Sequence, residues 1–74
     1  MPKLVPIKGK HLLRLLKDLG FLERDAEGSH VFLKHPDGRT TVIPIHNREL
    51  GRGLLRKILN DIQLSVEEYD KLRK

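Results

Sequence analysis

The tetrapeptide His35-Pro36-Asp37-Gly38 separates two strand-like segments, and it is the feature that most restricts the fold. Proline suits the second position of a type I turn, and glycine accepts the left-handed conformation that forms a G1 bulge. The pattern therefore predicts a β-hairpin whose strands lie within residues 30–35 and 39–45. With this turn His35 pairs with Arg39, and that one pairing sets the register of the whole hairpin.

The register divides the hairpin side chains between the two faces of the predicted sheet. Successive side chains of a strand point to opposite faces, and paired residues share a face. We assign to the core face the pairs Leu33 with Thr41, Val31 with Ile43, and Ser29 with Ile45. The uncovered face carries the pairs Lys34 with Thr40, Phe32 with Val42, and His30 with Pro44.

The same register brings two of the four histidines together. His46 lies two residues beyond Pro44, so it becomes a diagonal neighbour of His30, with Cβ atoms about 7 Å apart. His35 has the opposite parity and points to the other face. Because two imidazoles are too few ligands for a zinc site, we predict no metal. His11 and His35 are expected to be ordinary exposed residues.

The chain before the hairpin predicts one helix and one further strand. Leucines at i, i+3, i+4 and i+7 between Lys8 and Leu19 form the apolar stripe of a helix, and Gly20 supplies a left-handed stop. Residues 21–25 are expected to form a short strand, and residues 26–28 a turn.

The chain after the hairpin predicts two helices. A polar loop over residues 47–53 precedes apolar residues with helical spacing over 54–62. Ser65 followed by Glu68 has the form of a capping box, so a third helix is expected over residues 66–73. The order α-β-β-β-α-α predicts an α+β fold, in which a three-stranded antiparallel sheet has helices on one face.

Composition excludes several classes of protein. The 74 residues are enough for one domain, residues 1–74, and a chain this short buries only about 60% of its unfolded surface. We therefore expect a shallow site. The absence of cysteine excludes disulfides and thiolate chemistry. No segment is apolar enough to span a membrane or form a signal peptide, so we expect a cytoplasmic protein. The net charge of +5 favours a polyanionic partner, although such a charge also serves to keep a small domain in solution.

His30 is the candidate for chemistry on the uncovered face. An imidazole, with an ordinary pKa of about 6.5, accepts or donates a proton at neutral pH. RNA cleavage needs a base for the ribose 2′-OH and an acid for the departing 5′-oxygen. Two imidazoles, with Lys34 to stabilise charge on the phosphate, supply these parts without metal. The alternative is a surface histidine hydrogen-bonded to a loop carbonyl.

An ordered series of motifs resembles the HicA-type toxins, the small mRNA interferases of HicAB toxin-antitoxin pairs. The series covers most of the chain: Lys8-Gly9-Lys10, LKDLGF at 16–21, Arg24, Gly28-Ser29-His30, RTTVIPIH at 39–46, and GLLRKIL at 53–59. The resemblance implies a fold like a double-stranded-RNA-binding domain and an mRNA-cleaving activity. It places the catalytic role on the histidine of the triplet, His30. It also implies a HicB-type antitoxin that covers the site.

Two departures from the family pattern bear on the site. The triplet is often preceded by a basic residue in the family, whereas here Glu27 precedes it and puts a negative charge near the expected phosphate. The second helix begins with Leu54 where the family commonly has threonine, so no hydroxyl is available to a backbone cap or a phosphate. Neither change removes the histidine.

Further residues are candidates for positioning or RNA binding. Phe32 on the open face suits stacking on a base, although it also suits covering the sheet or contacting an antitoxin. Ser29 is expected to orient the turn or a phosphate, because no acid-histidine relay accompanies it. Basic residues about the loop and second helix favour phosphate contacts, although a solvated helix start has the same composition. With Phe32, the RNA-binding candidates are Arg24, Lys34, Arg48, Arg52, Arg56 and Lys57.

Three functions remain open on the sequence alone. The first is a metal-independent ribonuclease toxin that uses His30, with His46 assisting. The second is a non-catalytic binder of double-stranded RNA, and the third is a protein-interaction module with the same fold. Replacing His30 by alanine separates them, because the first predicts loss of cleavage, the second a small loss of affinity, and the third no effect on RNA.

Overall fold

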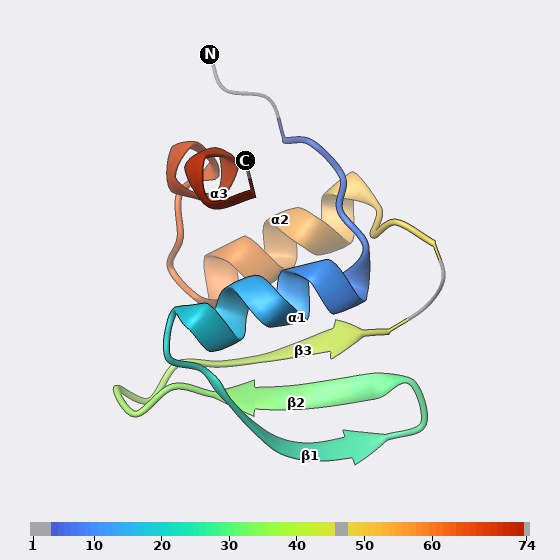
Figure 1. Ribbon diagram of the computed structural model, residues 1–74, viewed down its shortest axis with the longest axis vertical. Helices are drawn as coiled ribbons and strands as arrows, with labels where there is room; N and C mark the ends of the chain where they lie inside the picture. Colours follow the sequence, from blue (N-terminus) through green and yellow to red (C-terminus); the bar gives the residue numbers. More distant parts are fainter. Residues whose placement is uncertain (1–3, 46–47, 74) are drawn as a thin grey trace.

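The computed structural model describes residues 4–45 and 48–73 (Figure 1). The order of elements is α1 (Gly9–Asp18), β1 (Leu22–Glu27), β2 (His30–Lys34), β3 (Thr40–Pro44), α2 (Arg52–Asp61) and α3 (Val66–Arg73). The three strands form an antiparallel sheet in the order β1-β2-β3. This confirms the predicted α+β class, and the topology is consistent with a double-stranded-RNA-binding-domain-like fold.

The helices lie on one side of the sheet, as predicted (Figure 1). α1 and α2 lie next to the sheet, β3 is the strand nearest to them, and α3 lies farther away. The core between these layers consists of buried residues from both helices and from β2 and β3: Leu12, Leu16, Leu33, Ile43, Leu55, Ile58 and Leu59. Tyr69 of α3 is fully buried, and its hydroxyl donates a hydrogen bond to the Val5 carbonyl, which ties the N-terminal segment to the last helix.

The β2–β3 hairpin has the predicted turn and register. The His35 N–H donates to the Arg39 carbonyl at 2.8 Å, and the Gly38 N–H donates to the His35 carbonyl at 2.9 Å. Gly38 has a φ of 103°, the left-handed conformation expected at this position. All five predicted pairs between the strands are present, from Lys34 with Thr40 to His30 with Pro44. The turn chemistry therefore determined which side chains share a face.

β1 is longer than predicted, and the predicted turn over residues 26–28 is wrong. Ala26 and Glu27 belong to β1 and pair with Val31 and His30. The turn consists of only Gly28 and Ser29, and Gly28 has the positive φ, 61°, that a type II′ turn requires at its first position. All six residues of β1 are exposed, because the helices cover β3 rather than this edge of the sheet.

The two C-terminal helices begin at different kinds of cap. The predicted capping box of α3 is present: the Ser65 N–H donates to Glu68 Oε1 at 3.2 Å, and the Glu68 N–H donates to Ser65 Oγ at 3.1 Å. α2 begins at Arg52, earlier than predicted, and its N-cap Gly51 makes no side-chain hydrogen bond. No helix among the described residues is long and apolar enough to cross a membrane.

Candidate functional site

His30 is the first residue of β2 and lies at the end of the sheet where three strands meet. It pairs with Glu27 on β1 and with Pro44 on β3, and its side chain is exposed. Among the described residues, its ring has no hydrogen-bond partner. The alternative expectation, an imidazole held by a loop carbonyl, finds no support in the described part of the chain.

The chain that follows β3 adds a wall beside His30. It forms a pocket of about 580 Å³ lined by His30, Pro44, Arg48, Glu49, Leu50, Gly51 and Leu54, which we call the His30 pocket. Two backbone contacts hold this wall: Lys8 pairs with Glu49, and the Leu50 N–H donates to the Ile7 carbonyl at 2.9 Å. Pro44 shares the face of His30 as predicted, but it is buried rather than uncovered.

The N-terminus of α2 gives the His30 pocket a positive end. Gly51 and Leu54 line the pocket, and α2 has neither a capping side chain nor an acidic residue in its first turn. The first-turn N–H groups of a helix lack partners within the helix and, with the helix dipole, favour an anion. Arg48, which is exposed and lines the same pocket, adds a full positive charge.

Two carboxylates oppose this positive character. Glu49 lines the His30 pocket, and Glu27 lies directly across the β1–β2 ladder from His30. Side chains at directly opposite positions have Cβ atoms about 5 Å apart and share a face. The structure thus places the negative charge of Glu27 beside the imidazole, which is where the sequence departure placed it. A phosphate in the pocket would meet cations and carboxylates together.

In the sequence, Ser29 directly precedes β2, and His46 comes two residues after the end of β3. The Ile45 N–H donates to the Ser29 carbonyl at 2.6 Å, so the ladder continues past β3 in the predicted register. This bond uses the Ser29 backbone, and the positioning role of its hydroxyl stays a prediction. His46 and its predicted place diagonal to His30 lie outside the described residues.

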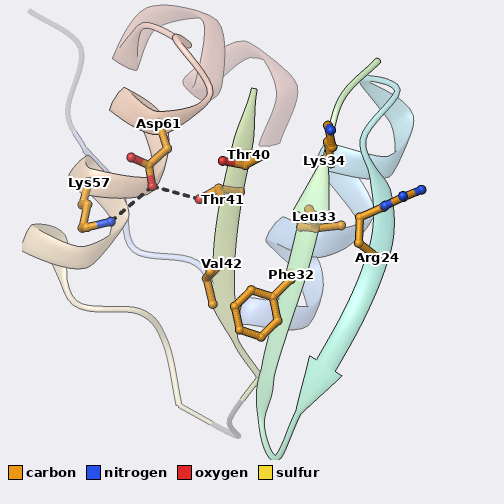
Figure 2. A pocket seen from close by; sticks show the side chains of 9 residues that line it. All are labelled: Arg24, Phe32, Leu33, Lys34, Thr40, Thr41, Val42, Lys57 and Asp61. Carbon is orange, nitrogen blue, oxygen red and sulfur yellow. Dashed lines mark hydrogen bonds and ion pairs between the residues drawn. The ribbon is translucent and has the colours of Figure 1, made fainter. Parts of the chain in front are cut away.

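A second hollow extends from the open face of the sheet to α2 beside the edge strand β3 (Figure 2). It has a volume of about 540 Å³, and we call it the Phe32 groove, lined by Arg24, Phe32, Leu33, Lys34, Thr40, Thr41, Val42, Lys57 and Asp61. Phe32 and Val42 are paired across the strands and are partly buried. Lys57 Nζ lies 3.3 Å from Asp61 Oδ2, which also accepts a hydrogen bond from Thr41 at 3.1 Å. The groove therefore combines an aromatic ring with three basic side chains.

The remaining basic candidates lie on a third surface. Arg52 and Arg56 line a hollow with the N-terminal segment, and Arg52 Nε donates to the Leu4 carbonyl at 3.3 Å. The structure thus divides the basic cluster expected about the start of α2: Lys57 borders the Phe32 groove, Arg52 and Arg56 border the N-terminal segment, and Arg48 lies beside His30.

Comparison with models of protein families shows the family of this chain. A family model described as the HicA toxin of bacterial toxin-antitoxin systems matches residues 9–64, which run from the start of α1 past the end of α2 and contain His30. The chain belongs to the HicA toxin family. The resemblance drawn from the ordered motifs is therefore confirmed. A search of curated proteins returned no match.

This HicA toxin also contains a histidine whose role the sequence did not indicate. His35 was expected to be an exposed turn residue, but its side chain is only 21% exposed. Its ring lies edge-on to Phe21, with centroids 5.0 Å apart, and its Nε2 lies 3.2 Å from the Leu19 carbonyl. Because a carbonyl only accepts, Nε2 donates to Leu19, while Nδ1 lies 3.2 Å from the Asp37 backbone nitrogen and 3.1 Å from Asp37 Oδ1. His35 thus joins the hairpin turn to the end of α1.

The HicA toxin offers no obvious metal site in the part of the chain that the structure describes. No three His, Cys, Asp or Glu side chains there are grouped so that they could hold a metal ion. The described residues that line the His30 pocket offer an imidazole, a guanidinium, a carboxylate and backbone amides.

Proposed function

We propose that this HicA toxin is a metal-independent endoribonuclease that cleaves mRNA at the His30 pocket. The observation that carries the proposal is the exposed His30 ring, free of protein partners among the described residues, at a pocket that also holds Arg48 and the uncapped end of α2. An exposed imidazole is suited to proton transfer, and the cationic end of the pocket is suited to a phosphate.

The proposed reaction is an in-line transesterification. A base takes the proton of the ribose 2′-OH, and the oxygen attacks the adjacent phosphorus. The bond from phosphorus to the 5′-oxygen breaks, and an acid protonates that oxygen. The products are a 2′,3′-cyclic phosphate and a free 5′-OH. We assign one proton transfer to His30 and propose His46 as the assisting group, with Ser29 positioning the turn or the phosphate.

Groups near the phosphate are proposed to stabilise the transition state. Arg48 and the first-turn N–H groups of α2 would donate hydrogen bonds to the non-bridging oxygens, where negative charge develops. Glu27 and Glu49 oppose phosphate binding, because one carboxylate lies across the ladder from His30 and the other lines the pocket.

The rest of the RNA is proposed to lie on the open face of the sheet. Phe32 offers a ring for base stacking, and Arg24, Lys34 and Lys57 border it. Arg52 and Arg56 remain candidate phosphate contacts on the neighbouring surface. We further propose that a HicB-type antitoxin inhibits the toxin by covering the His30 pocket, and that the toxin acts in the cytoplasm, where mRNA is found.

The decisive experiment is cleavage of a long single-stranded mRNA in EDTA by the parent chain and by His30→Ala at equal concentration. Lys71→Gln, a change at an exposed residue of α3, is purified in the same way as a control. We expect the parent and the control to cleave and to leave 2′,3′-cyclic phosphate ends, and His30→Ala to be inactive. Equal activity in all three would reject His30, and RNA binding without cleavage by any of them would favour a non-catalytic binder.

A further inference from the structure

A basic surface on α1 lies outside the residues proposed above. It surrounds a hollow of about 430 Å³ lined by Pro6, Ile7, Lys8, Lys10, His11, Arg14 and Glu49. We call the side chains of Lys8, Lys10, His11 and Arg14 the α1 basic face. All four residues are exposed, whereas Ile7 is buried. Most of the exposed side chains in the lining are therefore basic, and Glu49 is the acidic one.

Within the part of the chain that the structure describes, no ion pair neutralises the lysines and the arginine of the α1 basic face. Among the described residues, Lys8, Lys10 and Arg14 take part in no salt bridge, in contrast to Lys17 farther along the helix, which lies 2.6 Å from Glu23. Lys10 and Arg14 are four residues apart, so they lie on one side of α1, about 6 Å apart along the helix axis. This rise is comparable to the spacing of successive phosphates on a nucleic-acid strand.

The α1 basic face is continuous with the His30 pocket. Glu49 lines both hollows, and its backbone pairs with Lys8. The neighbouring Leu50 N–H donates to the Ile7 carbonyl at 2.9 Å, which fixes the wall of the His30 pocket against the chain that leads into α1. A strand that leaves the His30 pocket past Glu49 therefore meets the α1 basic face.

We propose that the α1 basic face binds the sugar-phosphate backbone of RNA that extends beyond the cleaved phosphate. This inference rests on the proposed function, because it is the His30 pocket that gives the strand its starting point. A nucleic acid fits this surface better than an acidic protein does, because the face is continuous with the pocket proposed to hold the cleaved phosphate and most of its exposed side chains are basic. The contact is independent of base sequence, because lysine and arginine bind phosphates.

The test measures RNA binding separately from cleavage. In a His30→Ala background, Lys10→Gln and Arg14→Gln are combined, and Lys17→Gln and Lys71→Gln are combined as the control. Each pair removes two of the positive charges that contribute to the net +5, and only the first pair lies on the α1 basic face. Binding of a fluorescent single-stranded RNA of about 20 nucleotides is followed by anisotropy over a range of salt concentrations.

We expect the Lys10/Arg14 pair to reduce the slope of log K against log salt by about 1.4, or about 0.7 for each lost phosphate contact. At an ionic strength of about 0.1 M this corresponds to an affinity loss of about 25-fold, if the two proteins bind equally at 1 M salt. The control pair should leave the slope unchanged, and thermal unfolding should show that both double variants are folded. Equal salt slopes for the two pairs would overturn the inference.

Two further outcomes are informative. If poly-glutamate binds as tightly as RNA and loses the same affinity in the Lys10/Arg14 variant, the face recognises acidic chains in general and the assignment to RNA is wrong. If the parent does not cleave RNA but the Lys10/Arg14 pair still lowers the salt slope, the proposed ribonuclease function fails while the binding face is supported.

Discussion

A histidine lies at each end of β2, and the two imidazoles differ in the contacts that they make. His30 begins the strand, is exposed, and has a ring without protein partners among the described residues. His35 follows the strand and is held by the Leu19 carbonyl, the Asp37 N–H and the Phe21 ring. The same side chain is thus available for chemistry at one end and committed to structure at the other.

The difference lies in what surrounds each ring. At the His35 end, the hairpin turn lies against the end of α1, so every polar atom of the imidazole is used. At the His30 end, the wall formed by Arg48 to Leu54 leaves a pocket open beside the ring. A histidine whose hydrogen-bonding atoms are satisfied within the fold contributes to stability, whereas one at an open pocket has its nitrogens free for a substrate. Four predictions, from the largest effect to the smallest, test this contrast.

His30→Ala should separate activity from stability most strongly. We expect kcat/KM for RNA cleavage to fall by about 10²- to 10⁴-fold, the usual contribution of a general acid or base. The free energy of unfolding should change by less than about 0.5 kcal/mol, because an exposed side chain without partners is removed. Urea unfolding and initial cleavage rates measure the two quantities. A large loss of stability would remove the contrast.

His35→Ala should have the reverse effect. It removes the hydrogen bond to Leu19 and the edge contact with Phe21, which together are worth about 1 to 3 kcal/mol. We expect urea unfolding to show a destabilisation of this size, and RNA cleavage at a temperature where the variant is folded to remain close to the parent rate. If cleavage by the folded variant falls as far as in His30→Ala, then His35 is also part of the active site.

Asp37→Asn should show how much the Asp37 carboxylate stabilises the hairpin turn next to His35. The backbone N–H of Arg39 donates to Asp37 at 3.0 Å, and this bond holds the pKa of Asp37 below its ordinary value of 3.8, with further help from the charge of Arg39. Because the pKa is lower in the folded protein, the carboxylate stabilises the fold at any pH above the pKa of Asp37 in the unfolded chain. This stabilisation is lost as the pH falls through the pKa in the folded state.

The melting temperature of Asp37→Asn should therefore lie below that of the parent at about pH 6, and the difference should disappear as the pH falls through the folded-state pKa of Asp37, which lies below 3.8. Glu68, whose pKa is lowered by the Ser65 backbone N–H, is present in both proteins and contributes the same acid sensitivity to each. A difference in melting temperature that stays constant over the whole pH range would contradict the assignment.

Glu27→Gln should give the smallest effect, at the His30 end. The carboxylate lies across the ladder from His30, so removing it should raise the affinity for RNA about twofold to fivefold, as expected for one exposed charge. Anisotropy in the His30→Ala background measures this, with Glu67→Gln in α3 as the matched control. Weaker RNA binding by Glu27→Gln would mean that the carboxylate supports the substrate rather than opposing it.

Features that a few neighbouring residues determine were predicted correctly, and the end of β1 was not. The register of β2 and β3 follows from four turn residues, and the cap of α3 from Ser65 and Glu68, so both could be predicted. The end of β1 could not, because Ala26 and Glu27 have no strong strand preference and join the strand only through the two-residue turn at Gly28 and Ser29.

The sequence by itself determined the elements, the hairpin register and the HicA resemblance, because periodicity, turn chemistry and motif order are properties of neighbouring residues. Only the tertiary structure decided that Arg48, rather than Arg52 or Arg56, lies beside His30, that Pro44 is buried, and that α1 carries a basic face continuous with the pocket. These placements depend on contacts between segments far apart in the chain, such as Lys8 with Glu49, and packing rather than local preference determines them.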